Sequence, residues 1–117
     1  MIVELNIAGD TVGFVFENAI TQGDVKAIQR KIKETLSSNA NINLYLEEDE
    51  VDDIKMGAFM NQVFFDVKHS ANIRKIAIVS DRKWIQAITI AKDILVQANV
   101  EAFTLKERVD AICWIMK

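Results

Sequence analysis

Apolar and polar residues alternate along the first part of the chain with the two-residue period of a half-buried strand. The alternation covers residues 2–7 and 11–16, and Ala8-Gly9-Asp10 between them supplies a turn. We therefore predict that these two segments pair as a β-hairpin. Three later segments also predict strands: residues 42–46, the continuous apolar run 76–79 of a strand covered on both faces, and the short segment 99–103.

Four other segments show the three-to-four-residue spacing of apolar positions that is typical of helices. The two middle helices are predicted over residues 54–70 and 82–96. The stripes that we expect to face the core are Val25, Ile28, Ile32 and Leu36; Met56, Met60, Val63 and Val67; Trp84, Ile88, Ala91 and Leu95; and Leu105, Val109, Ile112 and Met116.

Two capping boxes predict where the outer helices begin: Thr21 with Asp24, and Thr104 with Glu107. The element order is then β-β-α-β-α-β-α-β-α. Three successive strand–helix crossovers predict an α/β fold with a mixed, mostly parallel sheet of about five strands and four helices. The length of 117 residues fits one domain over the whole chain.

Ligands on open α/β sheets favour the edge beyond the carboxyl ends of the strands. In this chain that edge is predicted to hold residues 47–53, 80–84 and 103–104.

Composition and charge limit the classes of partner that the chain is expected to bind. The net charge is −3, and the 14 Lys and Arg residues are scattered. We therefore expect no nucleic-acid partner. The single cysteine, Cys113, cannot form an internal disulfide, and its apolar context predicts a small buried side chain. The N-terminus has neither a basic region nor a long apolar run, so the expected location is the cytoplasm.

A run of carboxylates is the most conspicuous polar feature of the chain. Six of the seven residues from 47 to 53 are acidic. Their spacing lacks the central glycine and distal Glu of a calcium-binding loop, so we predict no metal site there. Repulsion between like charges favours a mobile, solvated segment.

No catalytic set can be assembled from the remaining residues. His69 is the only histidine and has no nucleophile or orienting partner near it in the sequence. Gly9 and Gly13 are too isolated to form a phosphate-binding loop. The sequence therefore predicts a non-enzymatic protein without catalytic residues or cofactors.

Two apolar features fall outside this core pattern. On the helix predicted over 54–70, Ile54, Ala58 and Phe65 form a second apolar face. It would pack against a neighbouring helix or meet a partner chain or ligand. Trp84 is predicted in the first turn of its helix, where it would cap the core or form the wall or gate of a pocket.

The residues from Lys75 to Trp84 carry a resemblance. They read Lys-Ile-Ala-Ile-Val-Ser-Asp-Arg-Lys-Trp, similar to the K-I-A-V-V-x-D-x-K-W hallmark of small bacterial SpoIIAA-like proteins, and Asp81, Lys83 and Trp84 match its polar and aromatic positions. Residues 100–103 and 111–115 resemble that family's last strand and its ending. The resemblance implies the fold shared by STAS domains and the Sec14/CRAL-TRIO lipid-binding domains.

The resemblance implies two functional models. STAS regulators carry a phosphorylatable serine at the start of the second helix, but here the stretch 52–57 contains no Ser or Thr. Sec14-like domains hold a nonpolar ligand between sheet and helices, beneath a gate helix that approaches a membrane. The helix 82–96 would be the gate, with Ile90 as an exposed anchor. The ligand contacts would come from Trp84, Ile85 and Ile88, facing Phe64 and Phe65.

We therefore expect a domain that binds a nonpolar, lipid-like small molecule and associates peripherally with membranes. An elongated apolar cavity between the helices 54–70 and 82–96 would support this function. The alternative is a STAS-type regulatory module that binds another protein or forms a homodimer through Ile54, Ala58 and Phe65.

Overall fold

The computed structural model describes residues 2–17, 20–65 and 72–117. Its centre is a five-stranded sheet in the order β1-β2-β3-β4-β5. Strand β1 (Ile2–Ala8) is antiparallel to β2 (Thr11–Phe16), and β3 (Ile42–Glu47), β4 (Ile73–Val79) and β5 (Asn99–Phe103) follow in parallel. The predicted hairpin and the mostly parallel mixed sheet are thereby confirmed.

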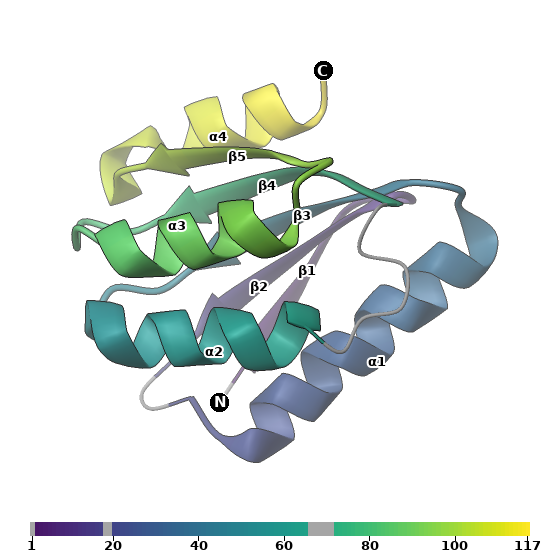
Figure 1. The fold of residues 1–117 in the computed structure, drawn as a ribbon. Coiled ribbons are helices and arrows are strands. Elements are labelled where there is room, and N and C mark those ends of the chain that lie inside the picture. Colours follow the sequence, from purple (N-terminus) through teal and green to yellow (C-terminus); the bar gives the residue numbers. More distant parts are fainter. Residues whose placement is uncertain (1, 18–19, 66–71) are drawn as a thin grey trace.

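Three helices cover one face of this sheet and the fourth lies on the other (Figure 1). Helices α1 (Gln22–Ser38), α2 (Asp53–Phe65) and α3 (Ile85–Ile94) connect neighbouring strands in turn. Because the parallel strands follow one another in sequence order, crossovers of the same hand place these three helices on the same face. Helix α4 (Arg108–Ile115) follows β5 and a short 3-10 turn at Leu105–Glu107.

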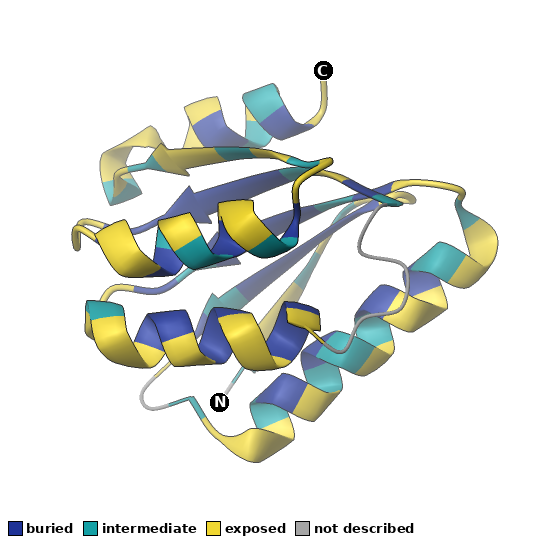
Figure 2. Cartoon of the chain, in the orientation of Figure 1, coloured by how far each residue is buried: buried dark blue, intermediate teal, exposed yellow. Residues whose placement is uncertain are grey.

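The sheet therefore separates two apolar clusters. Figure 2 shows the buried residues of the strands in dark blue between the helices. The larger cluster lies under α1–α3, and the predicted stripe of α1 packs there around Ile28 and Ile32, both fully buried. The smaller cluster lies under α4 and is built from Tyr45, Ala77, Val79, Ala111 and Ile115.

Both predicted capping boxes are present. The Asp24 backbone N–H donates to Thr21 Oγ1 over 3.2 Å, and the Thr21 N–H donates to Asp24 Oδ2 over 2.9 Å. At the 3-10 turn, the Glu107 carboxylate accepts from the Thr104 N–H over 2.8 Å. This backbone hydrogen bond, with one from the Thr104 hydroxyl, lowers the pKa of Glu107.

The stripe predicted for the last helix is wrong at two of its four positions. Leu105 and Ile112 pack against the smaller cluster as predicted, but Val109 is 72% exposed and Met116 55% exposed, while Ala111 and Ile115 are buried instead. The segment begins with a 3-10 turn, which has three residues per turn, so the phase of the following α-helix is shifted from that expected. Cys113 is exposed for the same reason, and the prediction that it is buried is also wrong.

Helix α3 is shorter than predicted, because it runs only from Ile85 to Ile94. Helix α2 is described from Asp53 to Phe65, and residues 66–70 of its predicted span lie outside the described residues. Val67 and His69 lie outside the described residues. No helix in the described part of the chain is both long enough and apolar enough to span a membrane.

Candidate functional site

The acidic segment at the carboxyl edge of the sheet is ordered by hydrogen bonds. Asp49, Glu50 and Asp52 are exposed to solvent as expected, but Glu48 is not. Glu48 is only 3% exposed, and its carboxylate accepts hydrogen bonds from the backbone N–H groups of Glu50 and Val51. The shortest of these joins Val51 N to Glu48 Oε2 over 2.6 Å. Backbone donors stabilise a buried carboxylate much as a cation would, so repulsion between neighbouring charges does not decide this segment's structure.

Two further carboxylates of the segment cap helices. Asp52 Oδ1 accepts from the Lys55 N–H over 2.8 Å at the start of α2. Asp53, the first residue of α2, accepts from the N–H groups of Gln86 and Ala87, each over 2.9 Å. Helix α3 has no side-chain cap from its own N-cap residue. Its first turn is therefore capped by the neighbouring helix, an arrangement that fixes α3 against α2.

Trp84 is the N-cap residue of α3 and not part of its first turn as predicted. The side chain is 2% exposed, and its indole Nε1 donates to the Val51 carbonyl oxygen over 2.8 Å. Of the two roles predicted for Trp84, this geometry favours the structural one. The indole closes the larger core and ties the β3–α2 loop to the start of α3.

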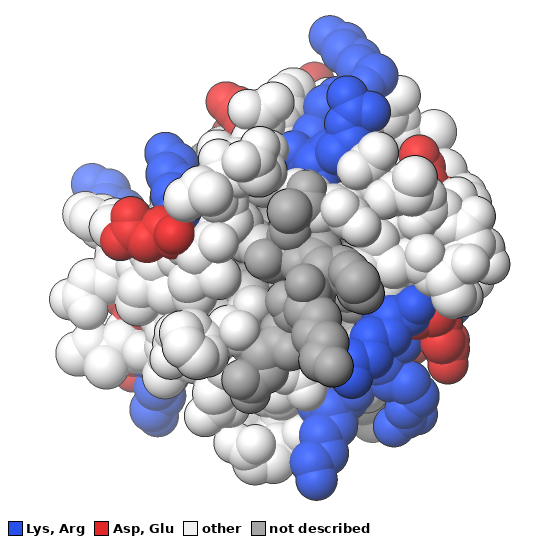
Figure 3. Space-filling view, turned by 45° about the vertical axis from the view of Figure 1, so that its right-hand side comes forward, with Lys and Arg blue, Asp and Glu red and all other residues white. Residues whose placement is uncertain are grey.

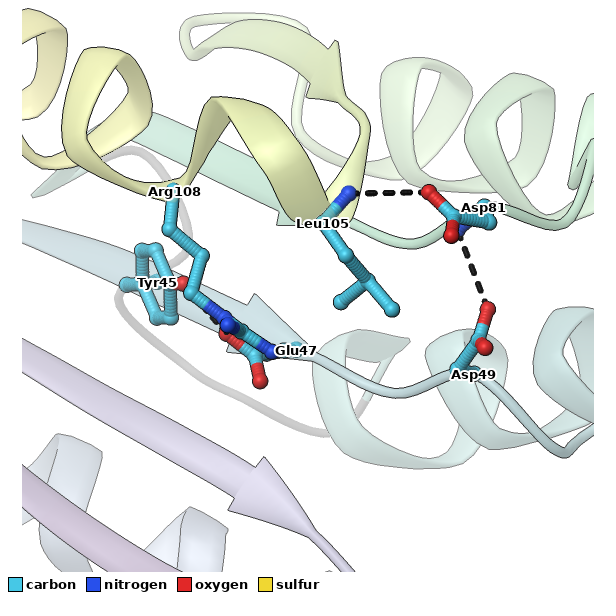
Figure 4. Close-up of polar contacts among 6 residues, drawn as sticks. All are labelled: Tyr45, Glu47, Asp49, Asp81, Leu105 and Arg108. Atoms are coloured by element: carbon cyan, nitrogen blue, oxygen red, sulfur yellow. Dashed lines mark hydrogen bonds and ion pairs between the residues drawn. The ribbon is translucent and has the colours of Figure 1, made fainter.

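Asp81 of the resemblance motif lies at the same edge (Figure 4). The Asp81 N–H donates to Asp49 Oδ1 over 3.1 Å, and Asp81 Oδ1 accepts from the Leu105 N–H over 2.9 Å. Arg82 Nε donates to the Asp49 carbonyl oxygen over 2.7 Å. Asp81 thus joins the loops that follow β3, β4 and β5, whereas Lys83 is exposed to solvent.

A triad on the α4 side of the sheet was not predicted from the sequence. The Tyr45 hydroxyl donates to Glu47 Oε1 over 2.6 Å, and Arg108 Nε donates to the same oxygen over 2.8 Å (Figure 4). Burial raises the pKa of Tyr45 well above its usual range, and the Glu47 carboxylate raises it further. The hydrogen bond to Glu47 raises the pKa of Arg108. Tyr45 and Arg108 are 63 positions apart, so no local pattern could have paired them.

Helices α2 and α3 are in direct contact, so the predicted apolar cavity between them is replaced by packing. Gly57 of α2 faces Ala87 and Ile90 of α3, and a Cβ atom at Gly57 would lie 3.0 Å from Ile90 Cδ1. Ile90 is therefore half-buried in this α2–α3 junction, and its prediction as an exposed membrane anchor is wrong.

The residues predicted to contact the ligand do not lie together, because some are buried by this packing and others are exposed. Trp84 and Phe64 are buried in the core, with Ile88 packed partly against it. Ile85 and Phe65 are 70% and 72% exposed. They do not form the two facing walls of one pocket, and their role as ligand contacts stays a prediction.

The second apolar face predicted for α2 is exposed within the described residues. Ile54 is 72% exposed, as is Phe65, and Ala58 between them is also exposed. Packing of this face against a neighbouring helix, one of the predicted alternatives, is therefore wrong for Ile54 and Phe65. A partner or a ligand remains the alternative for these side chains.

Helices α1 and α2 leave an open groove of about 560 Å³ between them, which no feature of the sequence predicted. Its floor is formed by Val25, Val51 and Phe59, all largely buried, with Ile20 and Ala58 beside them. The rim consists of Thr21, Gln22, Glu50, Asp52, Lys55 and Gln62. We call this hollow the α1–α2 groove.

Glutamine side chains bridge the two helices beside the groove. Gln22 Nε2 donates to Gln62 Oε1 over 3.1 Å, and Gln29 Nε2 donates to the Gln62 carbonyl oxygen over 3.0 Å. These exposed polar contacts hold the helices together without filling the apolar space between them.

The acidic segment and the groove share Glu50, Val51 and Asp52, and Val51 links the groove to the core. The side chain of Val51 lines the groove, its N–H donates to Glu48, and its carbonyl accepts from Trp84. The volume of the groove falls within the range of small-molecule sites, which is about 300–1,000 Å³. Its apolar floor and polar rim suit a molecule with a nonpolar part. Among the described residues, no group of three or more His, Cys, Asp or Glu side chains is arranged to hold a metal ion.

The comparison with protein families agrees with this architecture. The sequence model of the SpoIIAA-like family matches residues 11–116, nearly the whole chain. The chain belongs to the SpoIIAA-like family. No curated protein and no solved structure matched it.

Family membership gives the capping carboxylates a context. At the start of α2, where STAS regulators resembling this family carry a phosphorylatable serine, this SpoIIAA-like chain has Asp52 and Asp53. Both side chains are engaged by backbone N–H groups. They hold α2 and α3 in place through these hydrogen bonds.

Proposed function

We propose that this chain is a non-enzymatic SpoIIAA-like domain that binds a nonpolar small molecule in the α1–α2 groove. The observation that carries the proposal is the apolar floor of the groove around Val25, Val51 and Phe59, open to solvent between two helices. Pockets for small molecules combine such a floor with a few polar groups at the rim.

The resemblance to Sec14-like domains supports a nonpolar ligand, but it does not support the α1–α2 groove as the position of that ligand. That resemblance predicted a ligand beneath α3, but the α2–α3 junction is occupied by Gly57, Ala87 and Ile90. The α1–α2 groove lies on the same face of the sheet, between sheet-covering helices, and offers the space that the junction lacks.

Uptake of an uncharged apolar dye, N-phenyl-1-naphthylamine, tests the proposal. We expect its fluorescence to rise with the wild-type protein and with Thr89→Phe, which adds an aromatic ring to the exposed face of α3. Ala58→Phe places the same ring beside the floor of the groove and should abolish the rise. Equal dye uptake by the Ala58→Phe and Thr89→Phe proteins would exclude the groove as the binding site.

A second candidate function, a regulatory protein-interaction module, is favoured by the exposed face of Ile54, Ala58 and Phe65. Side chains of this kind are enriched where proteins meet. Sedimentation of the wild type and of an Ile54→Ser/Phe65→Ser double variant would test the homodimer form. A wild-type protein that stays monomeric at high concentration would exclude it. Peripheral membrane contact stays a prediction without a separate observation.

A further inference from the structure

The polar rim of the α1–α2 groove carries more negative than positive side chains. Glu50 and Asp52 belong to it where α2 begins, Lys55 is the one cation among its described residues, and all three side chains are exposed. The same acidic segment also contains Glu48 and Asp53, next to them in the sequence. A ligand group held at this end would therefore meet a negative potential.

Helix N-termini could reverse this preference, because their N–H groups attract anions. The N-termini of both α1 and α2 open on the groove, since Thr21 and Asp52 belong to its rim. Each N-terminus already has a capping contact within this chain: Thr21 Oγ1 accepts from the Asp24 N–H at α1, where the Asp24 carboxylate accepts from the Thr21 N–H, and Asp52 Oδ1 accepts from the Lys55 N–H at α2. Each cap satisfies one first-turn donor, and the carboxylates of Asp24 and Asp52 oppose the positive ends of the helix dipoles.

Basic side chains occur both near the acidic segment and on the face away from it. Arg82 and Arg108 contact Asp49 and Glu47 outside the groove, and Figure 3, turned toward the other end of the sheet, shows Lys and Arg side chains with few carboxylates among them. The basic residues of α1 are Lys26, Arg30, Lys31 and Lys33, which follow the first turn of the helix, and none of them lines the groove.

From this charge distribution we infer that the ligand of the α1–α2 groove is an amphiphile with a cationic head, an ammonium group on a nonpolar chain. The inference rests on the proposed function. The nonpolar chain lies on Val25, Val51 and Phe59, and the ammonium group lies between the carboxylates of Glu50 and Asp52 at the rim. A carboxylate or sulfate head in that place faces the same two negative groups and is repelled.

Three ligands with the same chain test the head group: decylammonium, decanol and decanoate, each below its micelle-forming concentration. Their affinities for the full chain are measured by isothermal titration calorimetry at low and high salt. We expect decylammonium to bind about tenfold more tightly than decanoate at low salt, with decanol between them. The preference should shrink at high salt, because exposed charges are screened.

Matched variants locate the effect. Glu50→Gln/Asp52→Asn removes both rim carboxylates, and Asn at position 52 keeps an oxygen that can cap α2. Asp93→Asn/Glu101→Gln makes the same change in net charge at exposed positions outside the groove. We expect the first pair to equalise the three affinities and the second pair to leave the preference unchanged, with both folded by circular dichroism.

The outcomes separate the inference from the proposed function. If all three ligands bind equally, or decanoate binds best, the inference of a cationic head is wrong, while the proposal that the groove binds a nonpolar molecule stands. If both double variants reduce the preference alike, the charge acts over the whole protein and the rim assignment is wrong. If none of the ligands binds, the proposed function fails with it.

Discussion

The two places where helices meet on the larger face of the sheet are built differently. The α2–α3 junction is closed by small residues, with Gly57 against Ala87, and by Asp53, which caps the neighbouring helix. The α1–α2 groove is bridged at its surface by Gln22 and Gln62 and stays open beneath. Small side chains let two helices approach, whereas long polar side chains join them at a distance. The resemblance pointed to the first place for a ligand, but among the described residues the helices are packed together there and leave a groove at the second.

The largest effect is expected from filling the closed junction. Gly57→Leu would force its side chain into Ile90 and the Ala87 backbone. We expect the free energy of unfolding to fall by about 3 kcal/mol, more than the ~1 kcal/mol gained by replacing a glycine within a helix. Urea unfolding measures this change. Ala58→Leu, one residue along but beside the groove, should change stability by less than about 0.5 kcal/mol; similar losses for both would remove the contrast.

Trp84 gives the next largest effect. Trp84→Phe keeps an aromatic ring but leaves the Val51 carbonyl oxygen without its indole donor. A buried acceptor without a partner costs about 1–3 kcal/mol, so we expect a loss of about 2 kcal/mol. Trp114→Phe on α4, which is partly exposed, is the matched control. Thermal unfolding of the two variants to the same midpoint would show that the Trp84–Val51 contact does not stabilise the fold.

The third largest loss of stability is expected when Asp53, which caps α3 across the α2–α3 junction, is replaced. Asp53→Ala removes the acceptor of the Gln86 and Ala87 N–H groups and should lower the free energy of unfolding by about 1 kcal/mol. Asp53→Asn retains an oxygen acceptor and should lose only a few tenths. Hydrogen exchange of the amides in the first turn of α3 should accelerate in the Ala variant. Unchanged exchange in that turn would contradict capping by Asp53.

The smallest effect is expected at the bridge over the groove. Gln62→Ala removes the acceptor of the exposed Gln22 side chain, and such a contact contributes about 0.5 kcal/mol. The Gln29 bond to the Gln62 backbone carbonyl is retained. Urea unfolding measures the difference. A loss as large as that of Asp53→Ala would mean that α1 and α2 are held together as firmly as α2 and α3.

Four of the five strands could be predicted from the sequence to within one residue. The segments 11–16 and 99–103 have the observed bounds, 2–7 and 42–46 extend by one residue, and 76–79 extends by three residues at its start. Their burial comes from alternation or from continuous apolar runs, which are local properties of the chain. Helix ends were harder to predict. Asp53 caps α3 and Trp84 precedes it, so contacts distant in sequence set where α3 begins.

The candidate site was only half visible in the sequence. The acidic segment stood out, but its carboxylates were expected to repel and be solvated. Glu48 is instead buried among backbone N–H groups that the turn of its own loop supplies. The groove was missed because its floor combines Val25 of α1 with Phe59 of α2, and each alone resembles ordinary core.

The sequence by itself determined the order of elements, the mostly parallel sheet and the family, although β2, predicted as half-buried, is buried on both faces. These follow from hydrophobic periodicity and from motifs that are contiguous along the chain. Only the tertiary structure decided which helix pair is closed and which is open. That choice depends on the side chains that two helices present to each other, such as Gly57 against Ile90 or Gln22 against Gln62. No periodicity within either helix specifies those pairs.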